Sequence, residues 1–200
     1  GFLALYALSG LRLAAWHEAA GLATAGLAWL DLSGLQVDGH ARLLVLSTAS
    51  ACFVVACGML GRLLARLVRD RNLLLPVLVT AMAADLFTVY AGPTQQALEK
   101  APALVRHLSV GVPQAGSAAG AKGPAGLVLA ASIGLGDYIF AALFLSAAWR
   151  HRLNVPGAAA GATIGALVGM ACVFLIPSLQ ALPLLPFIGL GVLLPNAARF

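Results

Sequence analysis

The amino-acid sequence predicts an all-α protein, a polytopic transmembrane bundle of about six to seven membrane segments in a single domain over residues 1–200. Hydrophobic residues make up 61% of the chain and charged residues only 10%, unlike an ordinary soluble domain. The apolar residues form runs long enough to cross a bilayer, and most charges fall in the connections between them. We therefore expect an integral, multi-pass membrane protein, in the plasma or inner membrane if the source is prokaryotic.

The first half of the chain holds four apolar segments. Residues 1–10 are too short to span a bilayer alone, and we expect that further spans precede residue 1. The basic run at 61–71 is interpreted as an interfacial anchor whose arginines extend to lipid headgroups. His17 and Glu18 are likewise interpreted as interfacial. The other three segments are expected at residues 14–30, 43–60 and 72–92.

The second half opens with the longest polar stretch, which we expect to be a flexible loop over residues 93–124, partly of linker composition. Segments at 125–149 and 157–176 follow, and a seventh segment runs to Ala198 with prolines before and within it. The sixth segment carries glycines at four-residue spacing, which predicts close packing, chiefly against its own neighbours. These glycines are Gly157, Gly161, Gly165 and Gly169.

Two acids lie inside apolar segments, Asp85 in the fourth and Asp137 in the fifth. An ionisable group at membrane depth is costly, so each is a candidate functional residue. If the two carboxyls face each other away from bulk water, they share one proton, because both cannot easily ionise. Such a pair can hydrolyse a peptide bond: one carboxylate takes a proton from water while the other polarises the scissile carbonyl. Gly134 and Gly136 leave room beside Asp137 for another backbone.

Three motifs in this order resemble the presenilin and signal peptide peptidase family of intramembrane aspartyl proteases of the GxGD type. Gly134-Leu-Gly-Asp137, followed by Tyr-Ile-Phe, is similar to the family's G-x-G-D signature. Ala84-Asp85-Leu86 matches the position of the family's other acid, and Gln180-Ala-Leu-Pro183-Leu-Leu-Pro186 resembles its Pro-Ala-Leu-Pro segment. The chain departs from the family pattern twice, with Ala84 in place of tyrosine and Leu184 in place of alanine.

The resemblance implies a presenilin-like fold and an endopeptidase that cuts transmembrane segments of membrane proteins or signal peptides. It implies that Asp85 and Asp137 are catalytic and that no cofactor or metal takes part. Leu184, larger than the family's usual alanine, is expected to narrow the substrate site. The residues that it implies for substrate binding are Gly134, Leu135, Gly136, Pro183, Leu184 and Leu185.

Two other functions stay open at this point. A proton-coupled transporter or channel would use the same two acids to carry protons. A catalytically inactive relative, suggested by Ala84, would only bind membrane helices.

The partners expected from the sequence are transmembrane-segment substrates and the lipid bilayer; accessory subunits and oligomeric state stay open. The net charge of +5 lies in connections with few aromatic residues, which indicates membrane topology and headgroup contact and argues against nucleic-acid binding. Eight of the twelve Lys and Arg residues are assigned to one side of the membrane, which predicts that this side is cytoplasmic. The three cysteines show no metal-binding spacing and are expected to be small buried residues.

Overall fold

The computed structural model describes residues 1–35, 40–91, 109–113, 129–175 and 183–199. Most of the predicted loop at 93–124 lies outside these residues, as do Pro177 and the first part of the Gln180–Pro186 motif.

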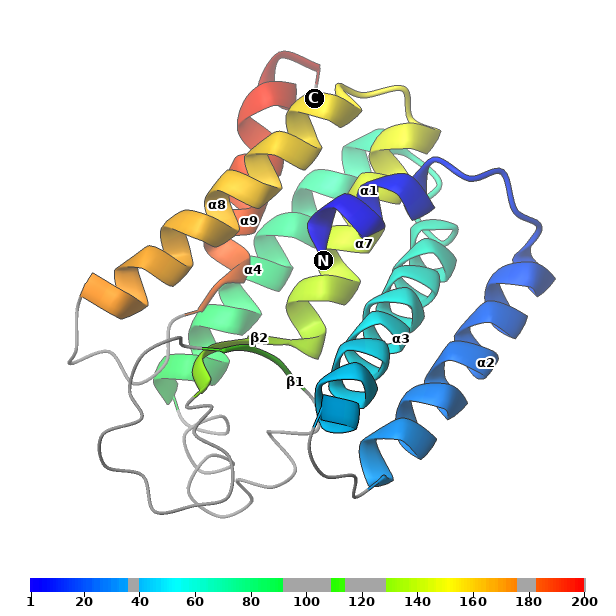
Figure 1. The fold of residues 1–200 in the computed structure, drawn as a ribbon. Coiled ribbons are helices and arrows are strands. Elements are labelled where there is room, and N and C mark those ends of the chain that lie inside the picture. The colour runs from blue at the N-terminus through cyan, green and yellow to red at the C-terminus, as the bar shows by residue number, and fades with distance from the viewer. Residues whose placement is uncertain (36–39, 92–108, 114–128, 176–182, 200) are drawn as a thin grey trace.

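The described residues form a helical bundle with one short antiparallel pair of strands, so the predicted helical architecture is confirmed (Figure 1). α3 packs between α2 and α7, and α9 packs against both α8 and α4. α7 lies in the interior, and half of its residues are buried. The elements are α1 (Phe2–Ser9), α2 (Ala15–Gly34), α3 (His40–Ala65), η1 (Arg71–Leu73), α4 (Leu74–Ala91), β1 (Ser109–Pro113), β2 (Leu129–Gly134), α7 (Leu135–Arg150), α8 (Val155–Leu175), α9 (Leu185–Leu193) and η2 (Leu194–Arg199).

In the part of the chain that the structure describes, three helical segments are long and apolar enough to cross a membrane: Leu44–Ala65, Arg71–Val89 and Val155–Val173. This supports a membrane protein. Three is fewer than the predicted six to seven. α7 has 16 residues and Leu185–Arg199 is also short, whereas a spanning helix needs about 20. α2 has 20 residues but is not apolar enough to be among the candidate spans.

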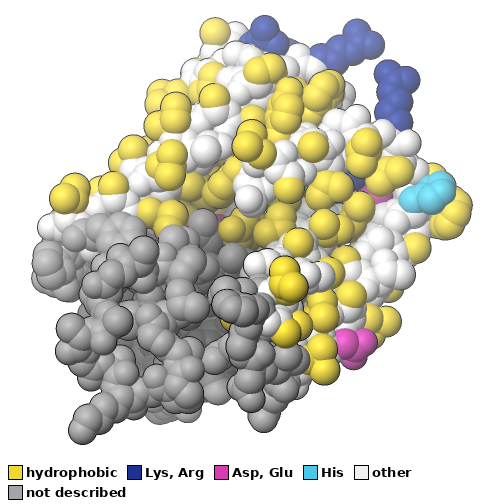
Figure 2. Space-filling view, viewed as in Figure 1, with side chains coloured by type: hydrophobic (Ala, Val, Ile, Leu, Met, Phe, Trp, Pro, Cys, Tyr) yellow, Lys and Arg dark blue, Asp and Glu magenta, His cyan; other side chains and the backbone are white. Residues whose placement is uncertain are grey.

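The surface of the molecule agrees with its assignment as a membrane protein. Hydrophobic side chains cover much of the visible helical face, and Arg side chains gather at one end (Figure 2, top). On α8, the large side chains of Ile164 and Leu167 are each 60% exposed. At the basic end, Arg150 donates hydrogen bonds to the carbonyls that close α3, and Arg199 donates to the Arg152 carbonyl. An apolar flank with a basic end is the pattern expected of a bundle seated in lipid.

The fifth segment differs from its prediction. We expected one helix over 125–149, but Leu129–Gly134 forms β2 and the helix begins only at Leu135. β2 pairs antiparallel with β1, and Gly134 lies opposite Ser109. Gly134 is extended (φ −73°, ψ 161°), which ends the strand and starts the helix. The expectation of one helix was wrong because a short apolar run looks the same in sequence whether it folds as strand or helix.

The glycine stripe of α8 packs against α9, as predicted. A Cβ on Gly161 would collide with the backbone carbonyl of Gly191, and one on Gly165 would collide with that of Phe187. The two backbones therefore approach as closely as small-residue packing allows. This crossing holds α9 against the bundle.

We expect Gly161→Ala to lower the free energy of unfolding by about 1–3 kcal/mol or more, because the added methyl meets backbone that cannot rotate away. Gly26 is the matched control, since a Cβ there meets nothing within 4 Å. Gly26→Ala should be neutral or stabilise α2 by up to about 1 kcal/mol. Equilibrium unfolding of the detergent-solubilised protein measures both. Equal effects of the two substitutions would contradict the tight α8–α9 crossing.

Candidate active site

The structure brings Asp85 and Asp137 together. Asp85 lies in the C-terminal half of α4 and Asp137 in the first turn of α7, and both helices also contact α9. The two side chains are half-buried and close enough to interact electrostatically. Two acids more than fifty residues apart in sequence, one from each of two apolar helices, therefore share one site.

A backbone N–H group holds each carboxylate in the same way. The Leu185 N–H donates to Asp85 Oδ2 at 3.0 Å, and the Gly134 N–H donates to Asp137 Oδ2 at 3.1 Å. Within the described part of the chain, neither Oδ1 atom has a hydrogen-bond partner. Each acid is thus oriented through one oxygen and leaves the other for water or a bound group.

Among the described residues, none fills the space beside the first turn of α7. A Cβ on Gly136 would meet nothing within 4 Å, and one on Gly134 would meet only the Asp137 carboxylate at 3.6 Å. Gly136 is exposed and Leu135 is partly buried. The glycines are not used for close packing within the described chain, so they leave room for another backbone next to Asp137.

Pro183, Leu184 and Leu185 lie at the start of α9, and all three are buried. Leu185 reaches the site through its N–H group. The Leu184 side chain instead points toward α8, where its Cδ1 lies 2.5 Å from the Cβ position of Gly169. The expectation that Leu184 narrows the substrate site is therefore corrected: its side chain fills the groove that Gly169 leaves in α8.

Leu184→Ala is therefore expected to lower the stability of the fold and not to change the choice of substrate. Removing a mostly buried leucine should lower the free energy of unfolding by about 2 kcal/mol, the lower end for such changes, and leave the products of any cleavage unchanged. Gly169→Ala should be tolerated better in the Leu184→Ala background than alone, because its methyl would occupy the vacated space. A wider set of cleavage products without lost stability would restore the narrowing hypothesis.

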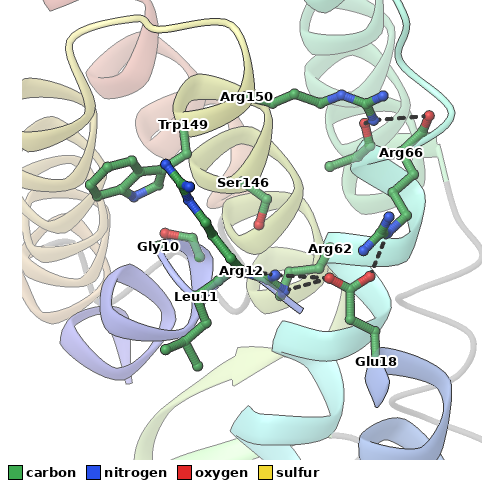
Figure 3. Close-up of a pocket in the computed structure, with 11 residues that line it drawn as sticks. Gly10, Leu11, Arg12, Glu18, Arg62, Arg66, Ser146, Trp149 and Arg150 are labelled. Atoms are coloured by element: carbon green, nitrogen blue, oxygen red, sulfur yellow. Dashed lines mark hydrogen bonds and ion pairs between the residues drawn. The ribbon is translucent and has the colours of Figure 1, made fainter. Parts of the chain in front are cut away.

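A buried ion pair at the C-terminal end of α3 was not predicted from the sequence. Glu18 is only 1% exposed, and its carboxylate binds Arg62 at 2.8 Å and Arg66 at 2.7 Å (Figure 3). The interfacial interpretation of Glu18 and Arg62 was therefore wrong, because each charge neutralises the other away from water. His17 matches its interpretation better: it is exposed and stacks on Trp16.

The same arginines tie the connection between α1 and α2 to α3. Arg62 donates to the carbonyls of Leu8 and Leu11, and Arg66 donates to that of Leu13 at 2.7 Å. The hydrogen bond from Arg66 to Glu18 raises the pKa of the Arg66 guanidinium above its usual range, so Arg66 stays charged. The available sequence signal was a carboxylate in the first turn of an apolar helix and two arginines four residues apart.

No three His, Cys, Asp or Glu side chains come together as a metal site within the described ranges. Cys57 is buried as expected, whereas Cys52 and Cys172 are only partly buried. All three are free thiols.

Comparisons with protein families, with characterised proteins and with solved structures find no match for this chain. The resemblance to the presenilin and signal peptide peptidase family therefore depends on its three motifs. The pairing of Asp85 with Asp137 and the contact from Leu185 are the structural observations that bear on it.

Proposed function

We propose that this protein is a presenilin-like, multi-pass intramembrane aspartyl endopeptidase that hydrolyses peptide bonds within transmembrane segments of membrane proteins or signal peptides. Asp85 and Asp137 form its catalytic pair. The observation that carries the proposal is that each acid comes from an otherwise apolar stretch of helix, and that the two meet beside open space. A pair of charged groups at this depth is too costly to keep without a function.

In the proposed reaction the two carboxyls share one proton. The ionised carboxylate takes a proton from water, whose oxygen bonds to the scissile carbonyl carbon, while the protonated carboxyl gives its proton to the carbonyl oxygen. The carboxyl that took the water's proton then gives it to the nitrogen of the gem-diol, while a gem-diol hydroxyl returns its proton to the other carboxylate. The C–N bond breaks to leave an acid and an amine, and the two carboxyls again share one proton. Either acid can take either role, because each accepts one backbone N–H.

The backbone around the pair supports an extended substrate. A peptide in a membrane must leave its helix before its bonds can be attacked, and its freed N–H and C=O groups then need partners. β2 ends at Gly134, three residues before Asp137, so a strand added to this sheet would run toward the acids. Pro183 precedes α9 and Pro186 lies in its first turn, so neither residue supplies a backbone N–H group where the chain enters the helix.

A peptidic transition-state analogue, with a hydroxyl at the scissile position, tests this proposal. It should bind the purified protein at least 100-fold more tightly than the same peptide without the hydroxyl, because a protease is complementary to the tetrahedral state. Asp137→Asn should remove most of that preference. Equal affinity for the two peptides would contradict the proposal and favour either the transporter or the inactive helix binder.

A further inference from the structure

A cavity of about 460 Å³ lies where the α1–α2 connection meets the C-terminal ends of α3 and α7 (Figure 3). Its size falls within the ~300–1,000 Å³ typical of small-ligand sites. Arg150, on its wall, is thirteen residues from Asp137 along α7, roughly 20 Å on an ideal helix. The cavity is therefore separate from the acid pair and does not depend on the proposed protease function.

The cavity is strongly basic. Arg12, Arg62, Arg66 and Arg150 line it, and Glu18 is the one acid among its lining residues, so four positive charges face one negative charge, a net +3. Glu18 is already bound by Arg62 and Arg66.

The other two arginines are not neutralised. Arg12 is exposed and has no ion-pair or hydrogen-bond partner among residues that the structure describes. Among the described residues, Arg150 donates only to the uncharged carbonyls of Ala65, at 3.5 Å, and Arg66, at 3.2 Å. Their positive charge is available to an anion, which two guanidinium groups can bind with charge-assisted hydrogen bonds.

A buried hydroxyl points to the same kind of ligand. Ser146 Oγ lines the cavity and is shielded from solvent, yet has no hydrogen-bond partner in the described part of the chain. In Figure 3 it is directed toward the side chain of Arg62. Buried polar atoms rarely go without a partner. An oxyanion in the cavity would accept the hydroxyl proton.

Several arginine side chains and a hydroxyl group together can bind a tetrahedral phosphate. The rim of the cavity indicates what kind of molecule carries this phosphate. Trp149 and Leu11 line the cavity but are 45% and 49% exposed, so apolar surface lies beside the charged interior. The cavity is at the basic end of the bundle, where candidate membrane spans reach the interface. We propose that it binds the phosphate of an anionic phospholipid headgroup, with the lipid chains against the apolar rim.

The test uses the purified full chain in detergent, titrated with dioleoyl phosphatidylglycerol and, separately, with dioleoyl phosphatidylcholine, sn-glycerol 3-phosphate and inorganic phosphate. Native mass spectrometry measures each affinity. Phosphatidylglycerol should bind at least tenfold more tightly than the other three ligands. Arg12→Gln should weaken phosphatidylglycerol binding about tenfold or more and Ser146→Ala severalfold, because each removes a hydrogen bond to the phosphate. The control is Arg69→Gln, which removes an exposed charge at the same end outside the cavity and should change nothing.

Arg12 is exposed and unpaired within the described chain, so its variant should fold, which circular dichroism and gel filtration check. An equal loss of affinity in Arg12→Gln and Arg69→Gln would overturn the proposal, because binding would then follow total charge. Equal affinity for phosphatidylglycerol and phosphatidylcholine would overturn it too. If glycerol phosphate or inorganic phosphate bound as tightly as phosphatidylglycerol, a soluble phosphate would replace the lipid as the ligand.

Discussion

Asp85→Asn and Asp137→Asn are each expected to lower the rate of intramembrane cleavage by about 10²–10⁴-fold, the contribution typical of a positioned acid or base. Asparagine keeps the size of the side chain and can still accept the backbone N–H from Leu185 or Gly134. It cannot take up or give a proton. The rate of product formation from a transmembrane peptide in proteoliposomes measures the effect, and the double variant should be no worse than either single one.

Asp70→Asn is the control for these variants. Asp70 is exposed, sits before η1 at the other end of α4, and makes no side-chain capping hydrogen bond. Its replacement should leave cleavage unchanged. Activity that persists in either Asp85→Asn or Asp137→Asn would remove the acid pair from the mechanism.

Arg62→Met is expected to lower the free energy of unfolding by about 3–5 kcal/mol, because it leaves part of the buried Glu18 charge uncompensated. It also removes the hydrogen bonds to the carbonyls of Leu8 and Leu11. Arg66→Met should cost only about 0–1 kcal/mol, although Arg66 binds the same carboxylate. The difference follows from exposure, which is 7% for the side chain of Arg62 and 39% for that of Arg66.

Equilibrium unfolding in mixed micelles measures both variants. Glu18→Met should recover part of the stability lost in Arg62→Met, since it removes the charge that the first change leaves buried. Similar losses in Arg62→Met and Arg66→Met would show that the ion pair is exposed to water and would contradict its assignment as buried.

The sequence was sufficient to predict the helical bundle and to single out the two acids that the structure brings together, because both signals are local. Runs of apolar residues mark helices, and a lone carboxylate within such a run is conspicuous whatever the fold. The four-residue spacing of Gly161 and Gly165 is also a local sequence signal, since it places both glycines on one face of a helix.

What the sequence did not predict depends on contacts between distant segments. β2 forms because residues 109–113 pair with it, and nothing in Leu129–Gly134 itself excludes a helix. The pairing of Glu18 with Arg62 joins residues 44 apart, so neither neighbourhood reveals that the charge is buried. The direction of Leu184 was misjudged for the same reason, because the groove that receives it is made by Gly169 on another helix.

Cleavage of a membrane segment by the purified protein tests the central proposal most directly. The full chain is reconstituted in liposomes with a peptide that has one transmembrane segment and soluble flanks, and mass spectrometry locates the new termini. The proposal predicts termini inside the hydrophobic segment, blocked by the hydroxyl-containing analogue and missing with Asp137→Asn. An intact peptide in the presence of folded wild-type protein, or cuts confined to the soluble flanks, would contradict it.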